Sequence, residues 1–282
     1  MTSLCPAPAP EGHLPTGQAL QEALGRLEGA IRSVGPMVVA LSGGADSALV
    51  AALSTRLLGR SSVRCVTAVS PSLAPWELED VTSLAREWGL DWRAVETREM
   101  SDPNYVRNDA SRCAACKSAL LDALEVLAPR GGDSVVLGVN VDDLSEHRPG
   151  QDLARSRGAR FPLVEAGIGK TMVRSISRHL GLRTWDKPAS ACLASRIPHG
   201  TPVSVAVLRR VGAAEAALHS LGFSQLRVRH YGETARVELD LAEMDRAIAL
   251  RAEIVSGLKA AGYSRVTLDL EGFRSGNLSP QL

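Results

Sequence analysis

A short apolar strand that runs directly into a Ser-Gly-Gly turn is the feature that most constrains the fold of this chain. Residues 37–41 are continuously apolar, which is typical of a strand covered on both faces of a parallel sheet. Residues 42–47 read SGGADS, and helical spacing of apolar residues resumes at Ala48. Two glycines allow a tight turn, the hydroxyls of Ser42 and Ser47 add donors, and a helix N-terminus favours an anion. This phosphate turn (residues 42–47) therefore predicts a pyrophosphate site at the carboxyl end of a strand.

Strands and helices alternate on both sides of the phosphate turn. Apolar spacing predicts helices at 18–34, 48–58, 78–88, 113–127 and 170–180, and strands at 37–41, 63–69, 90–96 and 134–139. This alternation indicates βαβ units, so the predicted fold class is α/β with a parallel sheet. After Gly200 the pattern changes to a helix at 203–221, strands at 225–231 and 234–240, a helix at 242–260 and a strand at 265–270. This α-β-β-α-β run predicts a small α+β domain.

These patterns divide the chain into three parts. Residues 1–17 are rich in Pro and Ala, and we expect them to form a flexible arm. Residues 18–200 form the predicted α/β domain and residues 201–282 the small α+β domain. The boundary falls in the segment 198–202, which contains Pro and Gly.

Composition argues against several classes of protein. The 32 Lys and Arg residues against 31 Asp and Glu leave a formal charge of +1, which does not fit a broad nucleic-acid surface. No stretch approaches the ~18 consecutive apolar residues of a membrane span. Residues 1–17 lack the basic and apolar segments of a secretory signal, and five cysteines are an odd number for a disulfide framework. We therefore expect a cytoplasmic protein with neither membrane nor nucleic acid as a partner.

A second group of polar residues follows the strand predicted at 134–139. Asn140, Asp142 and Asp143 come directly after it, so we expect them at the same sheet edge as the phosphate turn. Carboxylates there, together with Asp46, can hold Mg²⁺ beside a phosphate group. The alternative is that the aspartates cap a helix.

Basic residues supply candidate anion ligands. Lys117 and Arg196 are candidate clamps for phosphate or a carboxylate, with a solvated surface charge as the alternative. Gly169-Lys170-Thr171 looks like the end of a P-loop, but Val164 stands where that motif needs its first glycine, so this interpretation fails. Four charged residues of the small domain are candidates for contact with a substrate or metal, with a solvated strand face as the alternative: Glu215, Arg227, Arg229 and Glu238.

Several further segments match one known family. The motif SGGxDS, carried by Ser42, Gly43, Gly44, Asp46 and Ser47, is the PP-loop signature of ATP pyrophosphatases that form an adenylate. Further matches are SPS at 70–72, RCAACK at 112–117, GVNVDD at 138–143, RPG at 148–150 and WDKPASACLASRIP at 185–198. Together these segments resemble the LarE-type ATP-dependent sulfur transferases. Ala45 is a small departure, since a branched residue is commoner there.

The resemblance implies a fold and a reaction. The fold is a PP-loop domain, adenine nucleotide alpha hydrolase-like and Rossmann-like, followed by a small α+β domain. The reaction adenylates the carboxylates of a pyridinium-3,5-dicarboxylate mononucleotide with ATP, releases pyrophosphate and inserts sulfur, for the nickel-pincer cofactor of lactate racemase. The implied partners are this small-molecule nucleotide substrate, further copies of the chain in a homo-oligomer, and an iron–sulfur or sulfide donor.

Residue chemistry and the resemblance together assign roles within the predicted site. ATP and pyrophosphate binding falls to Ser42, Gly43, Gly44, Asp46, Ser47, Ser70, Gly138 and Asn140. Mg²⁺ binding falls to Asp46 and Asp143. The candidate catalytic residues are Asp46, Lys117, Cys192 and Arg196.

Cys192 is the candidate carrier of sulfur. It stands between Lys187 and Arg196, whose charges favour a thiolate, and in the family the cysteine of this block bears the transferred sulfur. In one version of the reaction it gives up its own sulfur and becomes dehydroalanine. The alternative is a buried, inert cysteine. We expect Cys5 and Cys65 to take no part.

Cys113 and Cys116 form a CxxC pair at the start of a predicted helix. With Cys192 they offer three thiolates for a [4Fe–4S] cluster, as in a subset of the family, whose fourth iron could carry the transferred sulfide. A zinc site would need further ligands, which His147 or His199 with Cys192 could supply. A thioredoxin-like pair would need a preceding strand of that fold, which the sequence does not show.

Three other functions are alternatives. A tRNA-thiolating PP-loop enzyme shares the turn and often the CxxC, but the charge of +1 counts against it. An amide-forming synthetase of the NAD or GMP type would need an ammonia route. A non-catalytic nucleotide-binding regulator would have no use for Cys113, Cys116 and Cys192.

Overall fold

The chain folds into two compact units that interleave along the sequence. The computed structural model describes residues 14–128, 133–144, 149–188 and 191–274. The first unit comprises Met1–Ser70, Glu77–Glu99 and Cys113–Ser190, and the second comprises Pro71–Trp76, Met100–Arg112 and Ala191–Leu282. Cys5, His147 and residues 1–13 of the expected arm lie outside the described residues.

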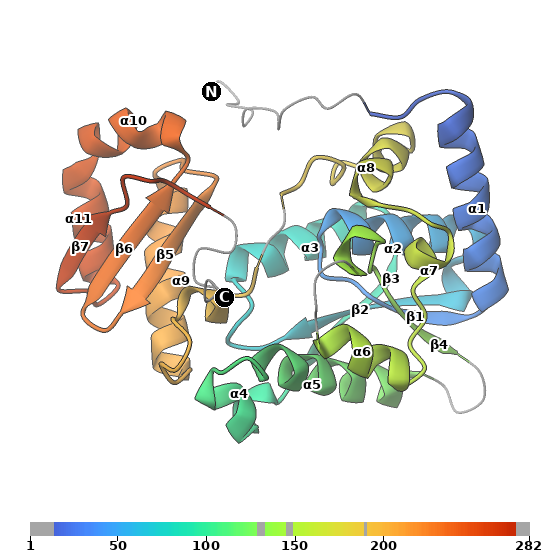
Figure 1. The fold of residues 1–282 in the computed structure, drawn as a ribbon, viewed down its shortest axis with the longest axis horizontal. Coiled ribbons are helices and arrows are strands. Elements are labelled where there is room, and N and C mark those ends of the chain that lie inside the picture. Colours follow the sequence, from blue (N-terminus) through green and yellow to red (C-terminus); the bar gives the residue numbers. More distant parts are fainter. Residues whose placement is uncertain (1–13, 129–132, 145–148, 189–190, 275–282) are drawn as a thin grey trace. The chain divides into compact units, whose positions relative to one another are not determined.

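A four-stranded sheet forms the centre of the first unit (Figure 1). Its order is β3 (Asp91–Glu96), β2 (Val63–Val69), β1 (Met37–Ala40) and β4 (Ser134–Leu137). All three pairings are parallel, with Met37 opposite Val63 on one side and Ser134 on the other. The predicted α/β class with a parallel sheet is confirmed. β1 lies between β2 and β4, and its continuous apolar run suits a strand that is buried on both faces.

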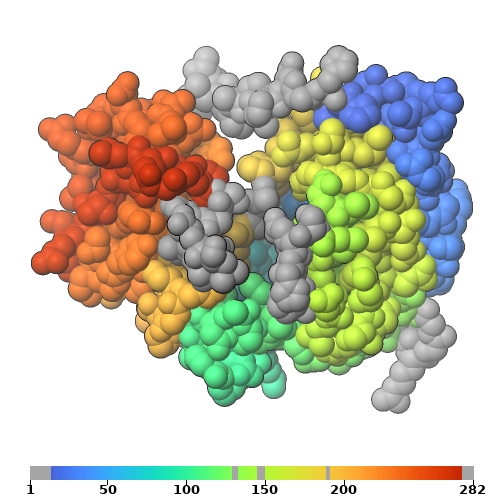
Figure 2. All heavy atoms as spheres, in the orientation of Figure 1, coloured from blue at the N-terminus to red at the C-terminus, as the bar shows by residue number. Residues whose placement is uncertain are grey.

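Helices cover both faces of this sheet (Figure 1). One face carries α1 (Gln18–Val34), α2 (Ala45–Leu58), α3 (Pro75–Glu87) and α8 (Lys170–His179), and the other carries α5 (Arg112–Leu127) and α6 (Pro149–Ser156). Successive residues of β1 alternate between the two cores, so Val39 packs on the first face and Val38 on the second. Helix α1, blue in Figure 2, lies on the outside of the unit and buries Leu20, Ala23, Leu27 and Ile31 at helical spacing. No helix in the described part of the chain is both long and apolar enough to cross a membrane.

Short elements complete the secondary structure. Two are single-turn α-helices, α4 (Pro103–Arg107) and α7 (Pro162–Glu165). The 3-10 helices are η1 (Arg60–Ser62), η2 (Glu99–Ser101), η3 (Asp142–Leu144), η4 (Leu193–Arg196) and η5 (Leu241–Glu243). None of these elements was predicted, because each is too short to show an apolar period.

The second unit contains a three-stranded sheet with its own apolar core. The strands are β5 (Leu226–Tyr231), β6 (Thr234–Leu239) and β7 (Arg265–Leu268), with β5 and β6 antiparallel and β6 and β7 parallel. The helices are α9 (Val205–Ser220), α10 (Met244–Ala249) and α11 (Arg251–Ala260), which pack on the core around Val228 and Val237. The predicted α-β-β-α-β order is present, except that the helix expected at 242–260 is broken at Leu250.

Long-range hydrogen bonds join two segments of the second unit. This unit includes Ala191 onward and two earlier segments of the chain, and the domain boundary at residue 200 stays a prediction. Buried Asn108 has a left-handed φ of 59°, and its Nδ2 donates to the carbonyl oxygens of Ile197, Pro198 and Thr201. These bonds join residues 89 to 93 positions apart, a separation that apolar spacing does not report.

Candidate active site

The phosphate turn after β1 gathers backbone and hydroxyl groups. Gly43 has a φ of 79°, in the left-handed region that favours glycine. The hydroxyl of Ser42 lies 3.0 Å from that of Ser47 and accepts from the backbone N–H of Gly44 at 3.4 Å. Ser47 Oγ also accepts from the N–H of Ser42 at 3.1 Å. Helix α2 begins at Ala45, three residues before the predicted start at 48, so its positive N-terminal end lies at the turn.

Asp46, in the first turn of α2, is the centre of a polar network. Its Oδ2 pairs with Nζ of Lys170 at 2.6 Å, and its Oδ1 accepts from Nδ2 of Asn140 at 3.2 Å. Asn140 follows β4, the strand beside β1, so the network joins the carboxyl ends of two neighbouring strands. Asn140 therefore lies at the sheet edge where the sequence places it.

Lys170 was not among the residues expected in this network. Helix α8 begins at Lys170, whose backbone N–H donates to Oδ2 of Asp142 at 2.6 Å. Gly169 precedes the helix and lies against the same carboxylate, since an added Cβ would be 2.9 Å from Oδ2 of Asp142. Gly169-Lys170-Thr171 is thus a helix start that brings an ammonium group to Asp46. In the sequence, Lys170 is marked only as the first residue of a helix after a glycine. This signal alone does not indicate a residue of a phosphate site.

The aspartates after β4 have different roles. Asp142 accepts from the first N–H of α8, so the helix-capping alternative holds for this residue. Asp143 accepts from the backbone N–H of Asn140 at 3.2 Å. Because Asn140 also bonds to Asp46, Asp143 lies at the same end of β4 as this network. Carboxylate oxygens are ligands that Mg²⁺ prefers, and Asp46 and Asp143 carry them. Oδ1 of Asn140 instead accepts from the backbone N–H groups of Asp142 at 2.9 Å and Asp143 at 3.3 Å, so Mg²⁺ binding by Asp46 and Asp143 stays a prediction.

Three other predicted site residues also lie in the first unit. Ser70 directly follows β2, which pairs with β1. Gly138 follows β4, and an added Cβ would lie 2.6 Å from Cα of Ser47, so a glycine is needed here for α2 to pack closely. Lys117 lies on α5, where its Cβ is 3.1 Å from the position of a Cβ added to Gly150. The binding roles of Ser70, Gly138 and Lys117 stay predictions.

In the second unit, Cys192 is exposed at the start of η4. The guanidinium of Arg196 donates to the carbonyl oxygens of Ala191 at 2.6 Å and Cys192 at 3.0 Å, and so holds the backbone that carries the thiol. Arg196 itself is buried and forms a bidentate pair with Glu215 at 2.8 and 2.9 Å. These contacts make Arg196 a positioning residue for Cys192, and its role as an anion clamp stays a prediction. The exposure of Cys192 excludes the buried, inert alternative.

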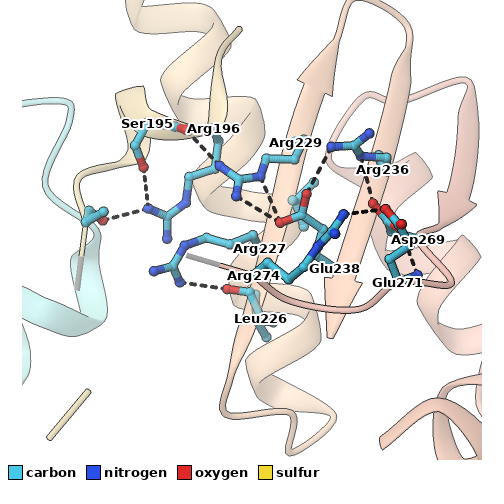
Figure 3. Close-up of polar contacts among 12 residues, drawn as sticks. Ser195, Arg196, Leu226, Arg227, Arg229, Arg236, Glu238, Asp269, Glu271 and Arg274 are labelled. Atoms are coloured by element: carbon cyan, nitrogen blue, oxygen red, sulfur yellow. Dashed lines mark hydrogen bonds and ion pairs between the residues drawn. The ribbon is translucent and has the colours of Figure 1, made fainter. Parts of the chain in front are cut away.

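A row of charged residues crosses the sheet of the second unit (Figure 3). Arg229 pairs with buried Glu238 at 2.9 Å and donates to the carbonyl oxygen of Ser195 at 2.9 Å. Arg236 reaches the other oxygen of Glu238 at 3.0 Å. These residues form a structural ion-pair network rather than a solvated strand face.

Arg227 differs from its neighbours in this row. Its guanidinium donates to the carbonyl oxygen of Leu226 at 2.8 Å (Figure 3). It also lies 4.9 Å from the ring centroid of Phe273. Within the described residues it pairs with no carboxylate. Burial, followed by the charge of Arg196, lowers the pKa of Arg227 to about 10. Arg227 is therefore a partly buried cation that would gain from an anionic ligand.

The other cysteines are divided between surface and core. Cys113 is exposed and Cys116 half-buried in the first turn of α5, in the first unit, whereas Cys192 belongs to the second. Among the described residues, no group of three or more His, Cys, Asp or Glu side chains is close enough to hold a metal ion. Cys65 is buried in β2, and burial raises its thiol pKa to about 12, which makes it a poor nucleophile.

Comparison with known proteins identifies the family. The chain is 35% identical over 257 residues to the pyridinium-3,5-bisthiocarboxylic acid mononucleotide synthase of Lactiplantibacillus plantarum, covering 91% of this chain and 93% of that protein. The chain belongs to this family of LarE-type sulfur transferases. It is also 46% identical over 245 residues to an uncharacterized protein of Synechocystis sp., covering 86% and 91% of the two chains. An uncharacterized protein of Methanocaldococcus jannaschii is 26% identical over 240 residues, covering 85% and 91%.

Family membership explains the phosphate turn. A family model described as NAD synthase matches residues 26–110, which include the turn and Asp46. The LarE-type chain is therefore a PP-loop enzyme that uses ATP, as the sequence predicted. The matched segment ends before Cys113, Cys116 and Cys192, so these three residues lie outside the part shared with the NAD synthase model.

Proposed function

We propose that this enzyme adenylates the carboxylates of a pyridinium-3,5-dicarboxylate mononucleotide with ATP, releases pyrophosphate, and inserts sulfur to give thiocarboxylates. The product would serve the nickel-pincer cofactor of lactate racemase. The observation that carries the proposal is the exposed thiol of Cys192 on a backbone held by Arg196. It is supported by the relationship, over 91% of the chain, to a synthase of a bisthiocarboxylic acid mononucleotide.

The first unit would carry out the activation step. The N–H groups of the phosphate turn and the N-terminus of α2 would bind the β- and γ-phosphates, while Ser42 and Ser47 exchange their mutual hydrogen bond for bonds to phosphate oxygens. A substrate carboxylate oxygen then attacks the α-phosphorus, and the bond from that phosphorus to pyrophosphate breaks. Asp46 and Asp143 would hold Mg²⁺, which supplies charge neutralisation for the pyrophosphate. Lys170 places a further positive charge beside Asp46.

The second unit would supply the sulfur nucleophile. In the sacrificial route the thiolate of Cys192 attacks the acyl carbon, and AMP leaves with the electrons of the bond to carbon. Loss of the α-proton of Cys192 then breaks its Cβ–Sγ bond, leaving dehydroalanine and a thiocarboxylate. In the cluster route, Cys113, Cys116 and Cys192 would hold a [4Fe–4S] cluster, which supplies a sulfide. Cys192 is exposed, as a nucleophilic thiol must be, and Cys113 is exposed and Cys116 half-buried on α5.

Arg227 would hold an anionic group of the nucleotide substrate. Its guanidinium is partly buried and lacks a carboxylate partner among the described residues. It lies close enough to Arg196 for the two charges to repel, and Arg196 holds the backbone of Cys192. A phosphate or carboxylate at Arg227 would relieve this repulsion and retain the substrate in the unit that carries the thiol.

Three cysteine variants distinguish the two sulfur routes. The wild type, Cys113→Ser, Cys116→Ser and Cys192→Ser are purified without air, assayed for iron and acid-labile sulfide, and given ATP with the dicarboxylate nucleotide. The cluster route predicts iron in the wild type and loss of product in all three variants. The sacrificial route predicts that Cys113→Ser and Cys116→Ser still complete one turnover, after which mass spectrometry finds Cys192 lighter by the mass of H₂S. Thiocarboxylate formation by Cys192→Ser would contradict both.

The choice of acceptor tests the alternatives. A pyridinium dicarboxylate nucleotide should stimulate pyrophosphate release from ATP, whereas tRNA should not. Stimulation by tRNA would favour a tRNA-thiolating enzyme. Stimulation by ammonia with a carboxylate acceptor would favour an amide-forming synthetase.

A further inference from the structure

The ammonium group of Lys187 lies beside the phosphate turn of the first unit. A Cβ added to Gly43 would be 3.7 Å from Nζ of Lys187 and 3.4 Å from Cβ of Val81 on α3. Lysine binds phosphate as a flexible point charge. Lys187 is therefore a second cation at the turn, in addition to Lys170, which reaches Asp46 from α8.

Carboxylates of α3 hold this ammonium group. Nζ of Lys187 donates to Oε2 of Glu77 at 2.9 Å and to Oδ2 of Asp80 at 2.6 Å. The other oxygen of Asp80 accepts from Arg183 at 2.6 Å. Burial acts to lower the pKa of Lys187, but the hydrogen bonds to Asp80 and Glu77 outweigh it, so the pKa is raised. Lys187 therefore stays protonated. An anion of higher charge can displace Glu77 and Asp80 from its ammonium group.

Lys187 and Glu77 each lie close in sequence to a point where the chain changes from one unit to the other. Glu77 is the residue at which the chain returns to the first unit after Pro71–Trp76. Lys187 stands shortly before Ala191, where the second unit resumes and Cys192 follows. The ion pair therefore fixes, within the first unit, the start of α3 to the segment that leads to the sulfur-bearing residue.

We propose that Lys187 is a phosphate-responsive tether, which couples ATP binding at the phosphate turn to the freedom of the segment leading to Cys192. The triphosphate of ATP carries more charge than either carboxylate and competes for the ammonium group. When Lys187 turns to the β- and γ-phosphates, its bonds to Glu77 and Asp80 break, and residues 184–188 lose this anchor on α3. Arg183, directly before them, keeps its own bonds to Asp80 and Glu87. The inference rests on the proposed function in one respect, the binding of ATP at the phosphate turn.

The test measures nucleotide affinity and backbone hydrogen exchange in the intact chain. The probe is α,β-methylene-ATP with Mg²⁺, because it lacks the bond that a PP-loop enzyme cleaves. In the wild type it should speed exchange several-fold at the amides of this segment, which are those of 184–187 because Pro188 has no N–H. Lys187→Gln should bind the analogue about tenfold more weakly, the loss of one charge-assisted contact. Its exchange at 184–188 should be fast without the analogue and unchanged by it, and Lys187→Arg should recover part of the affinity.

Two matched variants separate the tether from a general loss of charge. Glu77→Gln breaks the same ion pair but keeps the cation, so exchange should rise while affinity for the analogue stays within twofold of the wild type or improves. Arg183→Gln removes the other cation on Asp80 and should leave affinity within twofold. Wild-type affinity in Lys187→Gln, or exchange at 184–188 that the analogue does not change in the wild type, would overturn the proposal. The test contains no sulfur acceptor. Its result therefore does not depend on whether the enzyme carries out the proposed sulfur transfer.

Discussion

Arg227→Met should stabilise the fold and weaken substrate binding at the same time. Burial and the charge of Arg196 lower the pKa of Arg227 from 12.5 to about 10, a difference of about 2.5 units. Each unit corresponds to about 1.4 kcal/mol, which sets an upper limit of about 3 kcal/mol on the cost of this charge. Because the guanidinium keeps part of its contact with water, screening reduces the figure to about 1–2 kcal/mol. Methionine retains an apolar stem without the charge.

The sign of this effect follows from proton linkage. Arg227 is a base whose pKa is lower in the folded than in the unfolded chain, so the folded chain binds its proton less tightly. The unfavourable contribution is complete below about pH 10 and disappears as the pH rises from about 10 to 12.5. The stabilisation by Arg227→Met should therefore be full at pH 7.5 and at pH 9.

Urea denaturation at both pH values measures the effect, with Arg229→Met as the matched control. Arg229 is a neighbour on the same strand but pairs with Glu238, so its loss leaves a buried carboxylate without that partner. We expect the control to lose about 3–5 kcal/mol of unfolding free energy, the opposite sign to Arg227→Met. Affinity for the dicarboxylate nucleotide should fall at least about tenfold in Arg227→Met. Destabilisation of Arg227→Met by more than about 1 kcal/mol, or wild-type affinity, would refute the reasoning.

Three other variants test the phosphate turn and the block around Cys192. Asp46→Ala should reduce pyrophosphate release from ATP at least about 100-fold while the melting temperature stays within a few degrees; release at the wild-type rate would contradict the assignment of the turn. Gly138→Ala should destabilise by about 2–3 kcal/mol in urea, since the new Cβ would lie 2.6 Å from Cα of Ser47, whereas Gly29→Ala, with open space on a helix, should stabilise by about 0.5–1 kcal/mol. Equal changes in the unfolding free energy of Gly138→Ala and Gly29→Ala would contradict the packing argument. Glu215→Gln should destabilise by about 3 kcal/mol, because it leaves Arg196 buried without its carboxylate, and a change under about 1 kcal/mol would contradict this.

Much of the first unit could be predicted because its signals are local. The apolar run at 37–41 and the SGGADS motif predicted a central parallel strand and a phosphate turn, and β1 and α2 confirm this placement. Asn140 was predicted at the same edge from its position after a strand, and its bond to Asp46 bears this out. Neither prediction needed a long-range contact, because parallel strands align their carboxyl ends.

Other parts of the site could not be predicted because they depend on contacts between distant residues. Lys170 reaches Asp46 across 124 positions of sequence, and Lys187 reaches Glu77 across 110. A lysine at a helix start or in a loop has no periodicity that reports its partner. The pair of Arg196 with Glu215 is likewise invisible in the sequence, where the two are unrelated charged residues 19 positions apart.

The order of the strands, most of the longer helices, the phosphate turn and the family were determined by the sequence alone, because apolar period, glycine and local motif are properties of neighbouring residues. Tertiary structure decided which charges are paired and which are not. Arg196 and Arg229 have carboxylate partners, whereas Arg227 on the same sheet has none among the described residues. Such a difference arises from burial and from the geometry of side chains brought together by folding, and no spacing in the sequence encodes it.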